Sequence, residues 1–269
     1  MKTRWAIVLL AGSIFRPDTV RAQSVGHDLE NGFKDFIYIW TAPTRLRPGA
    51  LPELGAVLAA SAALLPLDEP LYNWLSKHPR SLPGTVLGVF GEDLPLARIG
   101  RTYVLVPVSL LLYTAGWVSD KPSLRQAGMG CISSNLSTTL TRNVLNRVLG
   151  RLRPVTKKGA FEFRPFLFRG STWDTRSFPG GHGGHIMSCA SFWSNRFDLG
   201  LGEPLLYAAA LGVGWARVMD GAHWPSDTFF GQVYGWAVGK AVADRYLQRA
   251  ERNEARTGAG VGFTIRIPL

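Results

Sequence analysis

Residues 177–193 read SFPGGHGGHIMSCASFW, a glycine-rich turn that leads directly into an apolar stretch. The four glycines between Pro179 and His185 let the backbone approach a ligand closely, with its N–H groups pointing at that ligand. A helix is predicted over residues 182–197, and the N-terminus of a helix favours a bound anion. An ordinary flexible loop is the alternative, but this turn carries His182 at the mouth of a helix. The stretch therefore predicts an anion-binding turn.

A basic cluster lies upstream, where a predicted helix over residues 123–150 ends before Pro154. The helix stops here because the residue before a proline disfavours the helical conformation. Residues 142–158 hold six basic side chains and no acidic one, namely Arg142, Arg147, Arg151, Arg153, Lys157 and Lys158. Guanidinium groups bind phosphate oxygens in pairs, which predicts an oxyanion clamp. A solvated basic helix end is the alternative.

A third cluster, residues 216–227, reads ARVMDGAHWPSD. Pro225 suits the first position of a new helix, so His223 is expected at the helix start. Asp227 can lie on the same face and accept a hydrogen bond from one imidazole nitrogen of His223. The other nitrogen would then be free to attack a substrate. A structural His–Asp pair is the alternative.

Together the clusters supply the groups that phosphoryl transfer requires. Arginines stabilise the charge on the transferred oxygens, one neutral imidazole attacks, and a second, protonated imidazole donates to the leaving oxygen. A metal site built from His182, His185 and Asp227 is a weaker alternative, because the adjacent arginines repel a cation. We therefore expect neither a metal nor another cofactor.

The clusters resemble the three motifs of the type 2 phosphatidic acid phosphatase superfamily, which also contains bacterial acid phosphatases and vanadium-dependent haloperoxidases. The motifs K-x6-R-P, P-S-G-H and S-R-x5-H-x3-D correspond here to residues 146–154, 179–182 and 216–227. The order and the separations of the motifs also fit, and the resemblance covers roughly residues 85–245.

The resemblance implies an all-α helical bundle with the active site at one end, and a phosphatase that works without a metal. His223 would be the nucleophile that forms a phosphohistidine, Asp227 would orient it, and His182 would be the general acid. The phosphoryl oxygens would be held by side chains and backbone at Arg153, Arg217, Gly180, Gly181 and the Asn146 position.

This chain departs from the family pattern at three positions. Asn146 stands where the family has Lys, which removes one charge, and Arg147 or Arg151 is expected to reach in instead. Gly180 replaces Ser and removes a hydroxyl donor, although its backbone N–H remains. Ala216 replaces Ser and is interpreted as a packing change. Since the two histidines and the carboxylate are kept, we expect activity that is lowered or shifted in substrate.

The apolar helices and the aromatic content favour a phosphorylated lipid as substrate, of the phosphatidic acid or polyprenyl diphosphate type, over a soluble phosphomonoester. Two other functions stay open from the sequence. One is a haloperoxidase that uses vanadate as its cofactor, and vanadate is also expected as an inhibitor of a phosphatase. The other is a relative that binds phosphate or lipid without catalysis.

The rest of the chain is predicted to be nearly all helix, over residues 53–66, 70–77, 84–92, 100–118, 123–150, 182–197, 203–219 and 225–250. Residues 151–181 lack helical periodicity, and a loop of this length in a compact domain is usually functional. No shift in composition marks a second domain within residues 23–255. The tail, residues 256–269, ends in the alternating GFTIRIPL, which predicts one short strand.

The N-terminus reads as a secretory signal over residues 1–22, with a basic start, an apolar stretch at 5–15 and a cleavage site before Gln23. The protein is therefore expected in the periplasm, or in the inner membrane with its site facing the periplasm. The apolar stretches at 49–67 and 103–118 fit either membrane embedding or the buried helices of a soluble domain.

Composition excludes several classes of protein. The 269 residues are 46% apolar and only 18% charged, which excludes a disordered chain. The net charge of +11 suits an anionic partner. The sequence contains no nucleic-acid-binding motif, so nucleic acid is not expected as a partner. Cys131 and Cys189 form no CxxC motif, and the sequence leaves open whether they pair or remain buried thiols.

Overall fold

The computed structural model describes residues 24–91, 98 and 100–257 of the chain. Within these residues the regular structure is helical, and no β-strand forms beyond one isolated bridge between Arg151 and Phe163. The predicted all-α class is therefore confirmed. The signal peptide predicted over residues 1–22 and the strand predicted near the C-terminus lie outside the described residues.

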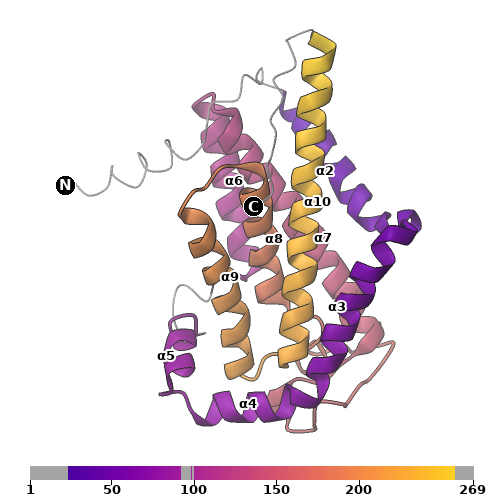
Figure 1. The fold of residues 1–269 in the computed structure, drawn as a ribbon, viewed down its shortest axis with the longest axis vertical. Helices are drawn as coiled ribbons and strands as arrows, with labels where there is room; N and C mark the ends of the chain where they lie inside the picture. The colour runs from indigo at the N-terminus through magenta and orange to yellow at the C-terminus, as the bar shows by residue number, and fades with distance from the viewer. Residues whose placement is uncertain (1–23, 92–97, 99, 258–269) are drawn as a thin grey trace, which may run out of the picture.

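Three long helices form the centre of the bundle (Figure 1). They are α7 (Pro122–Leu149), α8 (Gly181–Arg196) and α10 (Pro225–Thr257). Phe192 of α8 and Val242 of α10 are fully buried in the main apolar cluster. Burial of such side chains is the largest favourable contribution to folding, so this contact anchors the bundle.

Helices α8 and α10 approach unusually closely because α10 carries a glycine every fourth residue along one face. A Cβ atom at Gly231, Gly235 or Gly239 would collide with a backbone carbonyl oxygen of α8 or of Gly180 just before it. Small residues at this spacing let two helix backbones pack against each other. The first turns of both helices are thereby held side by side.

The remaining helices surround this centre. Helix α6 (Thr102–Val118) and helix α2 (Val25–Trp40) pack against α7, and α9 (Gly202–Met219) packs against α8. Helix α3 (Leu51–Leu64) lies beside α10, and α5 (Leu82–Gly88) lies beside α9. Short 3₁₀ turns occur at Ala42–Arg45, Pro48–Ala50, Leu65–Leu67, Pro154–Thr156 and Trp173–Thr175.

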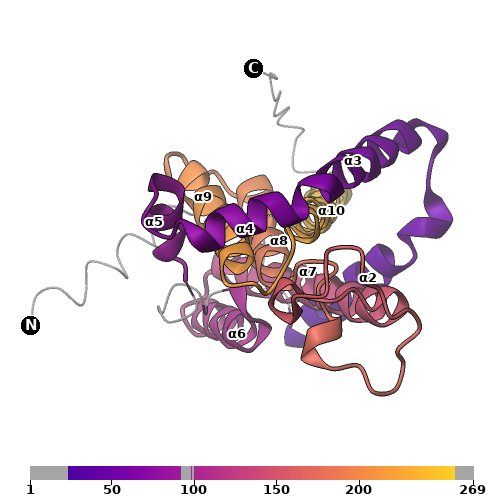
Figure 2. The same ribbon diagram turned by 90° about the horizontal axis from the view of Figure 1, so that it is seen from below.

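One end of the bundle gathers the functional segments. There α7 and α9 end, α8 and α10 begin, and α4 (Asp68–Lys77) runs across them, as Figures 1 and 2 show. The segment between α7 and α8 is irregular, as its missing periodicity predicted, and it folds over the same end. Three sequence clusters that lie far apart along the chain therefore meet.

Every helix predicted from residue 53 onward is present, but two predictions are wrong. Helix α2 was not predicted, because its buried face consists of Gly32, Asp35 and Ile39 rather than an apolar stripe. Helix α10 continues to Thr257 instead of ending at residue 250. Arg249, within the predicted part of this helix, forms an ion pair with the buried Asp35.

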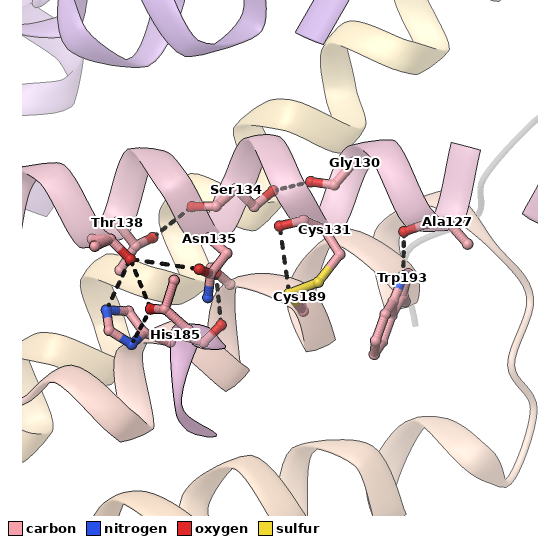
Figure 3. The surroundings of a disulfide bond; sticks show 12 residues. Ala127, Gly130, Cys131, Ser134, Asn135, Thr138, His185, Cys189 and Trp193 are labelled. Atoms are coloured by element: carbon pink, nitrogen blue, oxygen red, sulfur yellow. Dashed lines mark hydrogen bonds between the residues drawn. A yellow bond between two sulfur atoms is a disulfide. The ribbon is translucent and has the colours of Figure 1, made fainter. Parts of the chain in front are cut away.

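Cys131 of α7 and Cys189 of α8 form a disulfide, which decides the question that the sequence left open (Figure 3). Both residues are almost completely buried in the bundle. The indole N–H of Trp193 donates to the Ala127 carbonyl at 2.9 Å and joins the same two helices.

The stretch Pro48–Lys77 is long and apolar enough to cross a membrane by length and composition, and none of its apolar window is buried. Helix α3 contributes no buried residue, so the alternative of a buried core helix is wrong for residues 51–64. Helix α6 is also apolar but shorter.

Candidate active site

His223 lies just before α10 and is almost completely buried at the shared helix end. Its Nδ1 atom lies 2.6 Å from the Ser177 carbonyl oxygen, which can only accept a hydrogen bond, so Nδ1 carries the proton. The Nε2 atom then accepts from the backbone N–H of Gly181 at 3.4 Å. This tautomer leaves the Nε2 lone pair directed at the glycine-rich turn.

His182, in the first turn of α8, faces the same space. The centroids of the His182 and His223 rings are 6.4 Å apart. The Nδ1 atom of His182 is buried and has no hydrogen-bond partner among the described residues. A tetrahedral group between the rings would meet one imidazole on each side.

Asp227 occupies a different position from the one predicted. Its carboxylate accepts hydrogen bonds from the Ser177 hydroxyl, from the Trp224 backbone N–H at 3.0 Å, and from Arg151. The predicted hydrogen bond from His223 to Asp227 does not form, because the Ser177 carbonyl takes the Nδ1 proton instead. Ser177 therefore lies between Asp227 and His223 and contacts both.

Arg151 does not reach toward the histidines, so that expectation is wrong. It is fully buried between two carboxylates, Asp227 and Asp68, and its Nη2 lies 2.6 Å from Asp68. Asp68, the first residue of α4, also accepts from the Ser226 backbone N–H at 2.8 Å and so caps the start of α10. Arg147 donates from Nη1 to the Asn143 carbonyl at 2.8 Å on its own helix.

Arg153 and Arg217 lie in different surroundings. Arg153 stacks on Trp173 at 4.0 Å, donates to the Trp173 and Arg176 carbonyls, and forms no ion pair within the described chain. Arg217 pairs with Asp220 at 2.7 Å and donates to the Phe90 carbonyl at 3.1 Å. The carboxylate of Asp220 therefore already balances part of the Arg217 charge.

The glycine turn differs in detail from the expectation. The N–H of Gly180 donates to the Asp227 carbonyl at 2.8 Å, so it is engaged with α10 rather than left for a phosphate. A Cβ atom at Gly180 would lie 2.9 Å from that carbonyl oxygen, so a serine fits only if the backbone shifts. Asn146 is buried, and both polar atoms of its amide lack a partner among the described residues.

Burial and positive charge lower the basicity of the site. Desolvation, followed by the charge of Arg153, lowers the pKa of His223 well below its usual value. Desolvation and Arg217 lower the pKa of His182 in the same direction. Desolvation and Arg142 lower the pKa of Arg153 to about 9. A neutral His223 is what a nucleophile requires, whereas His182 can act as an acid only once a bound anion raises its pKa.

The sequence analysis assigned no role to Ser177, Asp68 or Arg176. Ser177 was visible as the polar residue before the glycine turn, but nothing in the pattern showed that its carbonyl would hold His223. Nothing in the sequence indicated that Asp68 contacts the site, because an acidic residue at a helix start usually stabilises the helix that it begins.

His185 lies one turn further along α8. Its ring nitrogens lie 3.3 Å from the Thr102 hydroxyl and 3.2 Å from the Thr139 hydroxyl, in the polar layer beside the disulfide (Figure 3). His182, His185 and Asp227 are therefore not brought together as ligands. Among the described residues, no group of three His, Cys, Asp or Glu side chains could hold a metal ion.

The comparisons with known proteins agree with this arrangement. A model of the PAP2 superfamily matches residues 127–250, which include all three clusters and the helices that carry them. Residues 127–250 are thus similar to the PAP2 superfamily. The resemblance drawn from the motifs is therefore confirmed, and the PAP2 region here is the part of the bundle from α7 to α10.

Two curated relatives are similar to this chain. A lipid A 1-phosphatase of Rhizobium etli is 31% identical over 156 residues, covering 52% of this chain and 64% of the relative. A lipid A 1-phosphatase of Rhizobium johnstonii is 34% identical over 101 residues, covering 36% of this chain and 38% of the relative. The chain thus spans less than two thirds of either relative. No solved structure matches the chain significantly.

Proposed function

We propose that this protein is a phosphatase that removes a phosphate group from a lipid, through a phosphohistidine on His223. The observation that carries the proposal is the closeness of the His223 and His182 rings, whose centroids lie 6.4 Å apart near the charge of Arg153. Guanidinium groups here supply the positive charge that phosphoryl transfer needs.

The proposed reaction uses the two histidines in turn. The Nε2 lone pair of His223 attacks phosphorus, and the bond from phosphorus to the leaving oxygen breaks. His182 gives its proton to that oxygen, so the dephosphorylated lipid leaves as an alcohol. Water then attacks the phosphohistidine and gives up a proton to His182, the P–N bond breaks, and inorganic phosphate leaves. The Nδ1 proton stays on His223 and is donated to the Ser177 carbonyl throughout.

A lipid substrate is supported by the surface beside the site. The segment between α7 and α8 exposes Phe161, Phe166 and Phe168 at 64%, 69% and 65%, and Trp173 of the same segment stacks on Arg153. Exposed apolar groups of this size are costly in water and mark a contact with lipid or protein. Lipid A, which names both relatives, is the first candidate substrate, ahead of phosphatidic acid and a polyprenyl diphosphate.

A periplasm-facing location is part of the proposal. Disulfides persist in oxidising compartments, so the Cys131–Cys189 bond supports an exported protein. The exposed apolar side chains of α3 and α6 support membrane attachment. Both arguments agree with the signal peptide that the sequence predicts.

The test is hydrolysis by the purified full chain in detergent. Lipid A, phosphatidic acid, undecaprenyl diphosphate and p-nitrophenyl phosphate are assayed for released phosphate. We expect turnover of at least one lipid, its loss in His223→Ala and His182→Ala, and normal turnover in the matched His27→Ala, whose side chain is exposed far from the site. A 32P label on His223 after an alkaline quench would support the intermediate. No turnover of any substrate would overturn the proposal, and vanadate-dependent halide oxidation would assign the haloperoxidase alternative instead.

A further inference from the structure

Arg142 lies on α7 one helical turn before Asn146, and it reaches the glycine-rich turn. A Cβ atom on Gly181 would collide with the Arg142 Nε and would lie 2.9 Å from its Cζ. The missing side chain at Gly181 is therefore what lets this guanidinium approach. Gly181 is also the residue whose N–H donates to His223, so Arg142 borders the reaction centre.

The charge of Arg142 has no partner within the described chain. It forms no hydrogen bond or ion pair there, and its Nε atom is buried. Two other basic side chains of the cluster differ, since Arg151 binds two carboxylates and Arg147 donates to its own helix. A buried donor left without an acceptor costs about 1–3 kcal/mol, which an incoming anion would offset.

The charge of Arg142 acts on both candidate catalytic histidines. Its charge lowers the pKa of His223, of His182 and of Arg153. Its own pKa falls to about 10 through burial and the neighbouring Arg176. Uncompensated guanidinium groups thus face one space, and like charges held this close favour binding of an anion.

We propose that Arg142 is a phosphate-binding residue that supplies, from one turn earlier on α7, the positive charge that the family motif places at the Asn146 position. The inference rests on the proposed function and adds a ligand of the phosphoryl group. Residues four apart on a helix share a face, so the two positions address the same space. Asn146, neutral and buried with its amide unpartnered, cannot provide the charge itself.

The test moves the charge between the two positions. Arg142→Ala is compared with Asn146→Lys, with the double variant that carries both changes, and with Lys121→Ala, which removes one exposed charge at the far end of α7. We expect Arg142→Ala to lower kcat/KM by about 10²–10³-fold and to weaken inhibition by inorganic phosphate at least about tenfold. We expect the double variant to regain at least about tenfold of the lost kcat/KM, and Lys121→Ala to match the wild type.

The outcomes separate this inference from the proposed function. Protection of the wild type against heat unfolding by inorganic phosphate is measured alongside turnover, because it does not depend on catalysis. A wild type without turnover overturns the proposed function. A folded Arg142→Ala with wild-type turnover and phosphate inhibition, or a double variant without recovery, overturns only the role of Arg142. If Arg142→Ala does not fold, Arg142→Gln carries the same comparison with less loss of packing.

Discussion

The Nδ1 atom of His223 and the carbonyl oxygen of Ser177 lie 2.6 Å apart, so a backbone group sets the tautomer and the orientation of the candidate nucleophile. The Ser177 hydroxyl is in turn held by Asp227, and Asp227 by Arg151, which also binds Asp68. A carbonyl is neutral at every pH, unlike a carboxylate. It therefore orients His223 without raising the pKa of its ring as strongly as a charged partner would.

Ser177 is expected to position His223 rather than to touch the substrate. Ser177→Ala removes the hydroxyl that Asp227 holds, and the carbonyl then loses its anchor. We expect kcat to fall about tenfold with KM unchanged, in line with the loss of one hydrogen bond to a charged group. Steady-state kinetics on a water-soluble phosphomonoester measures this, and Ser177→Thr should recover most of kcat. A rise in KM alone would contradict a positioning role.

Asp68 is expected to be a major source of stability at the site end. Asp68→Asn leaves the buried Arg151 with one carboxylate and weakens the cap on α10. We expect the free energy of unfolding to fall by about 3–5 kcal/mol. Asp244→Asn is the matched control, because its ion pair with Lys240 is 43% exposed on both sides and worth less than about 1 kcal/mol. Equal effects of the two changes in denaturant unfolding would contradict the prediction.

The pH dependence follows from the lowered pKa of His223. The folded protein holds this ring neutral below its ordinary pKa, so kcat/KM should persist as the pH falls through 6.5. The free energy of unfolding also falls as the pH falls, because the unfolded chain binds a proton at His223 more readily than the folded protein does. The contribution of His223 to stability is present above pH 6.5 and is lost as the pH falls below it. An acid limb of kcat/KM at or above pH 6.5 in His223-dependent turnover would show the prediction to be wrong.

The disulfide is expected to stabilise the fold without taking part in the reaction. Cys131 and Cys189 are 58 residues apart in sequence, and a cross-link that closes a loop of this length stabilises by about 4 kcal/mol in the chain-entropy model. The double Cys→Ser variant should unfold at lower denaturant concentration and keep its kcat at low temperature. A variant that is still folded but has lost its kcat would contradict a purely stabilising role of the disulfide.

The exposed phenylalanines beside the site are expected to act on lipid substrates alone. Changing Phe161, Phe166 and Phe168 to Ser should lower kcat/KM on phosphatidic acid in vesicles at least about tenfold, because apolar contact area with the lipid is lost. Hydrolysis of p-nitrophenyl phosphate should stay within about twofold. Leu201→Ser, which changes an 88% exposed residue at the other end of the bundle, is the control. Equal losses on both substrates would contradict a lipid contact.

Much of the fold could be predicted because it depends on local patterns. Helical periodicity, prolines and glycines predicted every helix from residue 53 onward, and the missing periodicity of residues 151–181 predicted an irregular segment there, but not its position over the site. Helix α2 escaped prediction because its buried face centres on Asp35, whose place in the core depends on Arg245 and Arg249 more than 200 residues later. No local pattern carries such a partnership.

The sequence by itself determined the helical class, the three polar clusters and the resemblance to the PAP2 superfamily, because residue type and spacing are properties of the chain. Which side chains meet was decided only by the tertiary structure. The close approach of α8 and α10 put the Ser177 carbonyl, not Asp227, against His223, and the crossing of α4 drew Arg151 away to Asp68. It also left Arg142 beside Gly181 without a counter-charge. Contacts between distant segments depend on how helices pack, and packing depends on all of the surfaces at once.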